Sequence, residues 1–428
     1  MGLQKFDWYS GCVGFVVFSF CLWLWFSIGF SGEASYVVGV FNTCGSFFCF
    51  DSVSFYLSLL SVFLWLSLVF MSGKMSRVSL GIITISVFCS LISYCCTHVL
   101  IFWVFYELSI LCLLLLLVIE SPYSERYIAS WYLLGYVVLT SLPMLLCLFY
   151  FSFFWGSFNV RFWFEGMDQD ISEVVVAVLG VMFITKIPLP PFHVWLPIVH
   201  AEASSAVSVC LSGYIMKLGV LGVCRFCSFI LPYSLFFDGY VIISMLMAVL
   251  FFFSATRELD GKRWLAFMSL SHIVIVCVCL CVVGFEGSAI AFLFSLGHGL
   301  SAGVTFVLLW LAYDISGSRN WNILKFCLSS SLLLRCLAVG CLCTVASLPP
   351  TVQFFSEVFI LCESGLLGAF FFCVFFLYLF CSGLVPLFFI GGLLTRHYSI
   401  SLGVGEVWAY NSSILFLMIW SFIGFMVV

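Results

Sequence analysis

The stretch of sequence that decides the fold is residues 186–219, which read KIPLPPFHVWLPIVHAEASSAVSVCLSGYIMKLG. It begins with Lys186 and is mostly apolar, and Lys217 lies near its end with apolar residues on both sides. Proline removes a backbone donor and breaks a helix, and four prolines interrupt the stretch: Pro188, Pro190, Pro191 and Pro197. The pattern therefore predicts a helix that ends near Lys186, a break, and then an apolar helix around Lys217.

The composition of the whole chain is that of a polytopic membrane protein. Of its 428 residues, 64% are hydrophobic and 8% are charged, whereas an ordinary soluble domain has about 25% charged residues. The 15 Lys and Arg and 19 Asp and Glu residues cannot cover a water-facing surface of this size. Composition therefore excludes a soluble enzyme, a disordered protein and a nucleic-acid-binding protein, which would need a basic face.

The 22 cysteines do not indicate a disulfide framework or a metal site. Most lie in apolar runs, as Cys277 and Cys279 do, and cysteine in such runs behaves as a small hydrophobic residue. One C-x-x-C motif joins Cys224 to Cys227, and no second pair of ligands accompanies it. We therefore expect neither disulfides nor a metal or redox role for the cysteines.

Charged residues punctuate the chain, so the apolar gaps between them can be interpreted as membrane crossings. A crossing helix needs about 20 apolar residues; 25 uncharged residues separate Asp7 from Glu33, and 22 separate Asp51 from Lys74. Residues 78–119 are long enough for two helices, with a polar break at 93–98, and residues 127–160 hold another crossing and a loop. Further crossings fit 239–256, 264–285, 287–313, 336–356, 364–395 and 407–428. With the helices around Lys186 and Lys217, the pattern predicts an all-α protein of about 13 transmembrane helices.

Four ionisable residues lie inside apolar runs: Glu107, Lys186, Lys217 and Glu357. A charge at mid-membrane costs at least about 2.5–3.5 kcal/mol on insertion scales, and such residues usually mark an ion or substrate path. Glu107 lies nine residues into the helix that starts near His98, which is about 13 Å deep, near the middle of a core about 30 Å thick. The alternatives are a structural ion pair and a snorkelling side chain, which suits Lys186 best.

A second proline pair, Pro349 and Pro350, interrupts a hydrophobic segment far downstream of the first. Irregular backbone at membrane depth is tolerated only where it lines a protein or water-filled cavity. Two broken helices in corresponding positions predict two inverted five-helix repeats, as in many transporters; the alternative is a pair of ordinary proline kinks. We place N-terminal helices in residues 1–97, the repeats in 98–238 and 239–395, and a C-terminal helix in 396–428.

Four histidines lie in or beside the apolar spans: His193, His200, His272 and His298. An imidazole takes up and releases protons near neutral pH. Together with the buried Glu and Lys residues, the histidines predict a proton relay across the middle of the membrane. His272 and His298 are the better candidates because each lies in an otherwise uncharged helix. His193 and His200 lie nearer the breaks and are assigned a supporting role; the alternative for every one of them is a structural histidine.

Five blocks, taken together, resemble the antiporter-like subunits of respiratory complex I. Residues 186–219 carry the family signature, FYELS surrounds Glu107, and SLSHI surrounds His272. GHGLSAG surrounds His298, and LPPTVQFFSE ends at Glu357. The resemblance covers most of the chain from residue 51 to residue 357. One branch of the family carries Glu at the position of Glu357, whereas the other branches and the multisubunit cation/proton antiporters typically carry Lys.

The resemblance implies a proton-pumping module whose charges form one axis. It implies that Glu107 pairs with Lys186, that Lys217 connects this pair to a central axis, and that the axis ends at Glu357. Lys262, His272 and His298 are implied to continue that axis. It also implies a multi-pass subunit of the mitochondrial inner membrane, with lipid and other membrane-arm subunits, including neighbouring antiporter-like subunits, as partners.

No cofactor is expected in this chain, and no nucleic-acid partner. It has no G-x-G-x-x-G on a strand–helix unit and no Cys₄ spacing. The resemblance implies that NADH, FMN, iron–sulfur clusters and ubiquinone are bound by other subunits, whose redox reaction drives proton movement through this one.

The sequence departs from the family pattern at three places. Ser204 stands where the family usually has Pro, and Ser356 stands where it usually has Gly. The N-terminal segment MGLQKFDWY is too short and too polar to cross, so the family's first helix is expected to be missing. Two other interpretations stay open: a cation/proton antiporter, which predicts Lys at position 357 and transport without a redox partner, and a membrane scaffold that pumps nothing.

Overall fold

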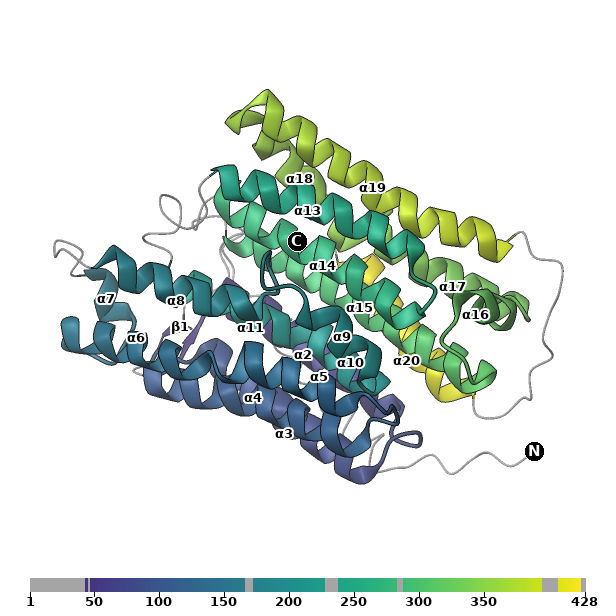
Figure 1. Ribbon diagram of the computed structural model, residues 1–428, viewed down its shortest axis with the longest axis horizontal. Helices are drawn as coiled ribbons and strands as arrows, with labels where there is room; N and C mark the ends of the chain where they lie inside the picture. The colour runs from purple at the N-terminus through teal and green to yellow at the C-terminus, as the bar shows by residue number, and fades with distance from the viewer. Residues whose placement is uncertain are drawn as a thin grey trace.

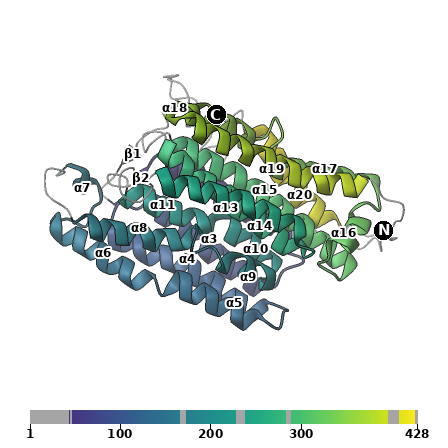
Figure 2. The ribbon, with the colours of Figure 1, turned by 45° about the horizontal axis from the view of Figure 1, so that its top comes forward.

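The computed structural model describes residues 43–44, 47–165, 172–227, 238–282, 288–394 and 407–424. In these residues the chain is a bundle of long helices that lie side by side (Figures 1 and 2). Nine of the described helices are long and apolar enough to cross a membrane. The predicted all-α polytopic class is therefore confirmed. The crossing predicted between Asp7 and Glu33, and the MGLQKFDWY segment, lie outside the described residues.

The first half of the described chain begins with a small antiparallel hairpin of β1 (Thr43–Cys44) and β2 (Cys49–Phe50). Its helices are α2 (Ser52–Phe70), α3 (Arg77–Cys95), α4 (Val99–Glu120), α5 (Arg126–Leu133), α6 (Ser141–Phe154), α7 (Arg161–Glu165), α8 (Glu173–Lys186), α9 (Trp195–Glu202), α10 (Ser205–Cys210) and α11 (Met216–Phe226). Two π-helical turns, η1 (Leu134–Val138) and η2 (Leu211–Ile215), lie between α5 and α6 and between α10 and α11.

The second half comprises α13 (Asp238–Arg257), α14 (Gly261–Val282), α15 (Ser288–Ser316), α16 (Trp321–Leu328), α17 (Leu332–Val345), α18 (Val352–Leu367), α19 (Ala369–Leu394) and α20 (Val407–Ile423). In both views α5 and α6 lie on one flank of the bundle and α19 lies on the other, with α14 and α15 between them (Figures 1 and 2).

Asp51 fixes the start of α2. Its carboxylate accepts from the backbone N–H of Ser54, and the Ser54 hydroxyl accepts from the backbone N–H of Asp51, so the two form a capping box. Arg225 of α11 binds both oxygens of the same carboxylate, at 2.5 and 2.8 Å. Burial opposes ionisation of Asp51, but the Arg225 guanidinium outweighs burial and holds the pKa of that carboxyl below its usual range. This pair ties α2 to α11 beside the hairpin.

The cysteines follow the sequence-based expectation within the helices and depart from it in the hairpin. Cys224 and Cys227 of the C-x-x-C motif are free thiols, and so are Cys277 and Cys279 of α14. Cys49 of β2 is disulfide-bonded, which corrects the expectation that the chain has no disulfide. The expectation rested on cysteines in apolar runs, and Cys49 lies outside the membrane-spanning helices.

The predicted helix boundaries are wrong around α18. A crossing was predicted at 336–356 and the next at 364–395, with a charged residue marking the boundary between them. Instead α17 ends at Val345, and Glu363 lies inside α18. The boundary lies at Gly368, whose φ of 150° is open to glycine alone. A charge in an apolar run therefore does not always mark the end of a helix.

The helix α15 forms the centre of the bundle and packs against α2 and α10 of the first half and against α14, α17 and α18 of the second. It is buried over the whole length of its most apolar stretch. At Gly297 the absence of a side chain lets α18 come close, since a Cβ there would lie 2.9 Å from the backbone nitrogen of Gln353. Backbone atoms cannot turn aside as a side chain can, so Gly297 sets the distance between α15 and α18.

Gly297→Ala should lower the midpoint of thermal unfolding of the purified protein. Alanine normally stabilises a helix interior by up to about 1 kcal/mol relative to glycine, so a loss here reports the steric clash with α18. Gly383→Ala in α19 is the matched control, because nothing lies within 4 Å of its added Cβ. An unchanged midpoint in Gly297→Ala would mean that the two helices can separate freely.

Candidate functional site

Glu107 and Lys186 form an ion pair inside the bundle. The Lys186 Nζ donates to Glu107 Oε1 at 2.5 Å, and the side chains of Lys186 and Glu107 are only 2% and 8% exposed. Lys186 Nζ also lies 4.6 Å from the centre of the Tyr106 ring, in cation–π geometry. A buried charge needs such partners, because its desolvation is costly. The pair therefore links the middle of α4 to the end of α8.

Lys186 is the last residue of α8, where the helix breaks. Residues 187–194 are turns that hold Pro188, Pro190 and Pro191, and helix resumes with α9. The indole N–H of Trp195 donates to the carbonyl of Thr185, so it satisfies one of the carbonyls freed at the end of α8. A cation at a helix C-terminus is stabilised by the helix dipole. The break therefore provides the place in which a lysine can be buried.

The second break lies between α17 and α18. Residues 346–351 separate the two helices and hold Pro349 and Pro350, both of which are exposed. The Thr351 side chain accepts from the backbone of Phe354 and caps the start of α18. Glu357 follows in the second turn of α18 and is buried. Each break thus lies beside one buried ionisable side chain.

Lys217 is fully buried next to the π-helical turn η2. Its Nζ donates to the carbonyl of Ser212 at 2.5 Å and lies 3.2 Å from His298 Nδ1. In a π-helical turn the hydrogen bonds skip one residue more than in an α-helix, and such turns recur at functional sites. Here the Ser212 carbonyl faces the ammonium group, and the turn therefore supplies one of the partners that Lys217 needs.

His298, His272 and Glu357 continue from Lys217 through α15, α14 and α18. The two imidazole rings lie 5.5 Å apart between centroids, and His272 Nδ1 lies 3.8 Å from Glu357 Oε1. The same carboxylate oxygen accepts from the Ser347 hydroxyl and from the Gln353 amide, each at 3.0 Å. We call Lys217, His298, His272 and Glu357 the ionisable row. All four are buried, and each helix contributes one of them.

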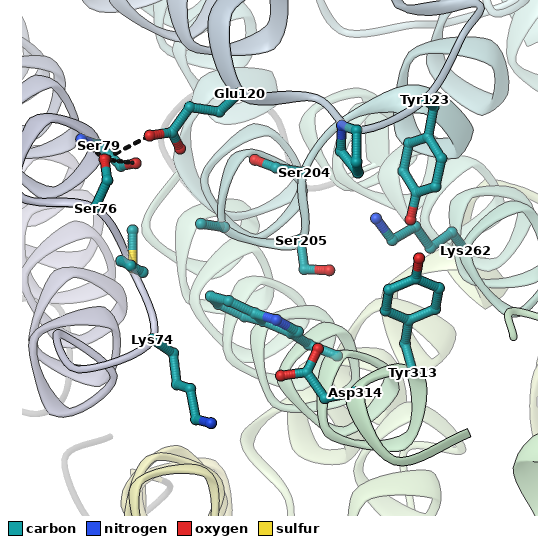
Figure 3. A pocket seen from close by; sticks show the side chains of 14 residues that line it. Lys74, Ser76, Ser79, Glu120, Tyr123, Ser204, Ser205, Lys262, Tyr313 and Asp314 are labelled. Carbon is teal, nitrogen blue, oxygen red and sulfur yellow. Dashed lines mark hydrogen bonds between the residues drawn. The ribbon is translucent and has the colours of Figure 1, made fainter. Parts of the chain in front are cut away.

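Lys262 lies apart from this row, at the second residue of α14. Its Nζ donates to the carbonyl of Ala203 at 2.7 Å and lies 5.1 Å from the centre of the Tyr123 ring. Lys262 lines a cleft of about 210 Å³ whose wall also includes Ser204 and Ser205. Figure 3 shows the Lys262 amine beside the hydroxyls of Tyr123 and Tyr313, with Lys74, Glu120 and Asp314 also around the cleft.

The cleft lies at the end of the bundle away from the hairpin. The helix α4 starts next to the hairpin, where Phe48 pairs with Cys96, and ends at Glu120 on the cleft. We call this end the cleft face and the other end the hairpin face. Ser204 departs from the family's proline, and its hydroxyl-bearing side chain lines the cleft. The cleft therefore gives Lys262 a polar route to the cleft face.

The two supporting histidines occupy different environments. His200 is fully buried and stacks on Phe306, with ring centroids 5.0 Å apart. Neither of its ring nitrogens has a hydrogen-bond partner among the described residues. His193 is half-buried against Phe251. Within the described chain no hydrogen bond or ion pair joins His193 to the other predicted residues, nor Lys186 to Lys217.

Sequence reasoning missed two side chains that contact the row. Gln353 bonds to Glu357 and lies 3.1 Å from His272 Nδ1, and the Tyr378 hydroxyl lies 2.7 Å from the same nitrogen. Gln353 lies four residues before Glu357, and residues with this spacing are neighbours on one face of a helix. This spacing is visible in the sequence and could have predicted the contact. Nothing in the sequence distinguishes Tyr378 from the many aromatic residues around it.

The residues described in the structure contain no group of three or more His, Cys, Asp or Glu side chains that could hold a metal ion. The ionisable row instead consists of single titratable groups, each within a few ångströms of the next. Proton transfer needs groups arranged in this way. Fold and site together define a polytopic membrane protein with a buried row of titratable side chains.

The chain belongs to the family described as NADH:quinone oxidoreductase/Mrp antiporter, whose transmembrane model matches residues 96–382. Among its relatives, NADH-ubiquinone oxidoreductase chain 4 of Chondrus crispus is 26% identical over 84% of this chain and 75% of its own length. The chain 4 protein of Ceratitis capitata is 27% identical over 76% of each chain. The resemblance seen in the sequence is therefore confirmed.

Solved structures share the fold. A chain of respiratory complex I from Thermus thermophilus with bound NADH superposes with a TM-score of 0.82 at 20% identity, over 96% of this chain and 90% of that one. A chain of the Mrp complex from Dietzia sp. DQ12-45-1b superposes with a TM-score of 0.78 at 14% identity, over 96% of this chain and 88% of that one. At these identities the likeness concerns the fold.

Glu107→Gln should destabilise the assembled protein by about 3–5 kcal/mol, because removal of one partner leaves the Lys186 ammonium buried and unpaired. The measurement is the midpoint of thermal unfolding of the purified assembly, with its amount on native gels. The double variant Glu107→Gln/Lys186→Met should recover much of the loss, since no buried charge then remains.

Glu125→Gln is the control for the loss of a carboxylate, because Glu125 is exposed just before α5. Equal destabilisation by Glu107→Gln and by the double variant would contradict the pairing, because the damage would then come from the glutamine itself.

Proposed function

We propose that this chain is a proton-translocating membrane subunit of NADH:ubiquinone oxidoreductase, equivalent to the chain 4 of its relatives. The observation that carries the proposal is the ionisable row, in which four buried titratable side chains from four helices lie next to one another. Ionisable groups at membrane depth are expensive and mark proton or ion paths. The names of the relatives and the family match support the choice of enzyme.

In this proposal a proton passes along the row by short transfers. The Lys217 ammonium gives a proton to His298 Nδ1, 3.2 Å away, and the neutral amine that remains keeps its bond to the Ser212 carbonyl. His298 passes a proton to His272, and His272 passes one to Glu357. A desolvated lysine suits this role because burial makes its charged form easier to discharge. The Glu107–Lys186 ion pair opens and closes in step with these proton transfers, and this changes the electrostatic potential at Lys217.

The cleft supplies the route by which the row exchanges protons with the cleft face. Lys262, which lines the cleft, takes up a proton there, and the buried His200 has the supporting role of relaying it toward Lys217. The breaks at Pro188, Pro190 and Pro191 and at Pro349 and Pro350 interrupt helical hydrogen bonding beside Lys186 and Glu357, respectively. One repeat spans residues 98–238 and the other spans 239–395, and each contains one break.

Neighbouring antiporter-like subunits and lipid contact the membrane face of this chain, and the complex lies in the mitochondrial inner membrane. NADH, FMN, iron–sulfur clusters and ubiquinone are bound by other subunits, and this chain carries no redox chemistry itself. The fold's occurrence in a complex I structure and in an Mrp complex supports an assembly of several membrane subunits.

A cation/proton antiporter subunit is the second candidate, and the likeness to a chain of the Mrp complex favours it. It differs in its driving force, because an antiporter exchanges ions without electron transfer. Purification separates the two: the complex I subunit is recovered with a large assembly that oxidises NADH. An antiporter subunit, in vesicles that lack NADH, still exchanges Na⁺ or K⁺ for protons.

Lys217→Ala should abolish NADH-driven acidification of vesicles, and Lys217→Arg should keep only part of it. Arginine preserves the charge beside His298 but does not release its proton at working pH. The measurement is acidification together with NADH oxidation, in assemblies checked on native gels. Lys325→Arg is the control, since Lys325 lies in α16 outside the row. Equal pumping with Arg and Lys at position 217 would mean that Lys217 is a fixed charge.

Glu357→Gln should lower proton pumping and NADH oxidation together, because a carboxamide cannot take the proton from His272. Glu357→Asp should lie nearest the wild type. Glu357→Lys should be milder than its charge change suggests, because other branches of the family carry Lys there. The measurement is the same pair of rates in sealed vesicles. Full pumping by assembled Glu357→Gln would show that this carboxylate is structural and that protons leave the row elsewhere.

A further inference from the structure

Gln353 lies between the last two members of the ionisable row. It is 1% exposed, in the first turn of α18, and its amide nitrogen lies 3.0 Å from Glu357 Oε1 and 3.1 Å from His272 Nδ1. Its amide oxygen lies 3.2 Å from the Ser301 hydroxyl of α15. The side chain thus contacts Ser301, His272 and Glu357, and its amide nitrogen faces the last two.

The contacts match the donors of a carboxamide. Its nitrogen carries two N–H groups and does not accept, so one N–H meets the carboxylate of Glu357 and the other meets an unprotonated His272 Nδ1. The direct distance from His272 Nδ1 to Glu357 Oε1 is 3.8 Å, which is longer than a hydrogen bond. A carboxamide does not exchange protons at working pH. It therefore separates the two groups without conducting between them.

A proton on His272 Nδ1 reverses this arrangement. The nitrogen becomes a donor, and it then faces the N–H of Gln353, which is also a donor. The Tyr378 hydroxyl, 2.7 Å from the same nitrogen, can turn and accept, because a hydroxyl both donates and accepts. The Gln353 amide cannot do so without swinging away. When it leaves, the negative Glu357 oxygen is the acceptor that His272 meets.

We propose that Gln353 is a latch that keeps His272 and Glu357 apart while His272 is neutral and releases them to pair when His272 is protonated. In the transfer, the N–H bond at His272 Nδ1 breaks and an O–H bond forms at Glu357 Oε1, so charge and protons balance. The amide then returns to the neutral imidazole. Because of the latch, transfer to Glu357, the last step of the row, takes place only after His272 has been protonated. The inference rests on the proposed proton path.

The groups around His272 define what the latch senses. On α15 His298 lies 5.5 Å away between ring centroids, with Lys217 of α11 behind it at 3.2 Å from His298. On α18 Glu357 is the facing charge, and on α19 Tyr378 is the facing hydroxyl. From α13 the His272 ring meets Phe252, which does not titrate. The latch therefore responds to the proton that arrives from Lys217 through His298.

The test replaces the amide while keeping the shape of the side chain. Gln353→Met is unbranched and of similar length but donates no hydrogen bond, so His272 and Glu357 are no longer held apart. We expect NADH oxidation to persist while the number of protons moved per NADH falls. The pH at which proton yield is half-maximal should also shift upward, since the N–H that stabilises neutral His272 is lost. Glu357→Gln, in contrast, lowers both rates together.

Gln353→Asn is the second variant, because it keeps the amide but shortens its reach. It should give a smaller change in both readouts than Gln353→Met, and it keeps the inference testable if Gln353→Met assembles poorly. Ser356→Ala is the matched control on the same helix, since the Ser356 hydroxyl bonds only to helix carbonyls among its described contacts. It should retain the wild-type proton yield.

Two results would overturn the latch. In one, assembled Gln353→Met or Gln353→Asn moves as many protons per NADH as the wild type, with the same pH profile. In the other, both rates fall in parallel at every pH, which a merely structural role produces. The wild-type assembly measured alongside tests the proposed function separately. If the wild-type assembly neither oxidises NADH nor pumps protons, the proposed proton path is wrong. If it does both, the variants test only the role of Gln353.

Discussion

The cost of burying the Lys217 ammonium is the constraint on which the rest of the structure depends. A fully desolvated cation in an apolar bundle is tolerated only where polar groups surround it. The π-helical turn η2 supplies the Ser212 carbonyl, and α15 supplies His298. His298 is itself a buried polar group that needs polar neighbours. It lies beside the ring of His272, which in turn lies beside the carboxylate of Glu357. One buried charge thus organises residues from four helices.

The same logic explains why both broken helices carry ionisable side chains close by. An unbroken helix satisfies its own backbone groups and leaves nothing for a charge to bond. At the end of α8 and in the gap before α18, carbonyls and hydroxyls are free to meet side chains, as Ser347 meets Glu357. The helix-breaking prolines and the buried charges therefore depend on each other. The breaks free polar groups that stabilise the charges, and the charged side chains satisfy polar groups that the breaks leave without helical partners.

The sequence predicted the fold class and the identity of the buried charges, because apolar runs and single charges inside them are local signals. The partners of those charges are not local. Glu107 and Lys186 are 79 positions apart, and Lys217 and His298 are 81 apart, so the resemblance to a family, rather than any pattern, suggested that they meet. Distances between them depend on helix packing, which a single sequence does not specify.

The missed features have separate physical causes. Gln353 is uncharged and was overlooked beside Glu357, although it lies one helical turn away on the same face. Tyr378 has no local signal, because its contact with His272 comes from another helix. The end of α18 differs from the prediction because the charge of Glu363 interrupts the apolar run without ending the helix, whereas Gly368, with a φ of 150° that only glycine adopts readily, does end it. The disulfide at Cys49 lies outside the helices from which cysteine behaviour was judged.

The enclosure of α15 limits how one half of the protein can influence the other. This helix contacts both halves and carries His298, yet it is surrounded by packed helices along its membrane-spanning stretch. Protein interiors are as dense as organic crystals, so sliding or tilting α15 would displace several neighbours at once. Small rotations of single side chains disturb this packing less than a movement of the whole helix does. The central helix is therefore a rigid partition, and His298 is the side chain through which it contacts both Lys217 on one side and the ring of His272 on the other.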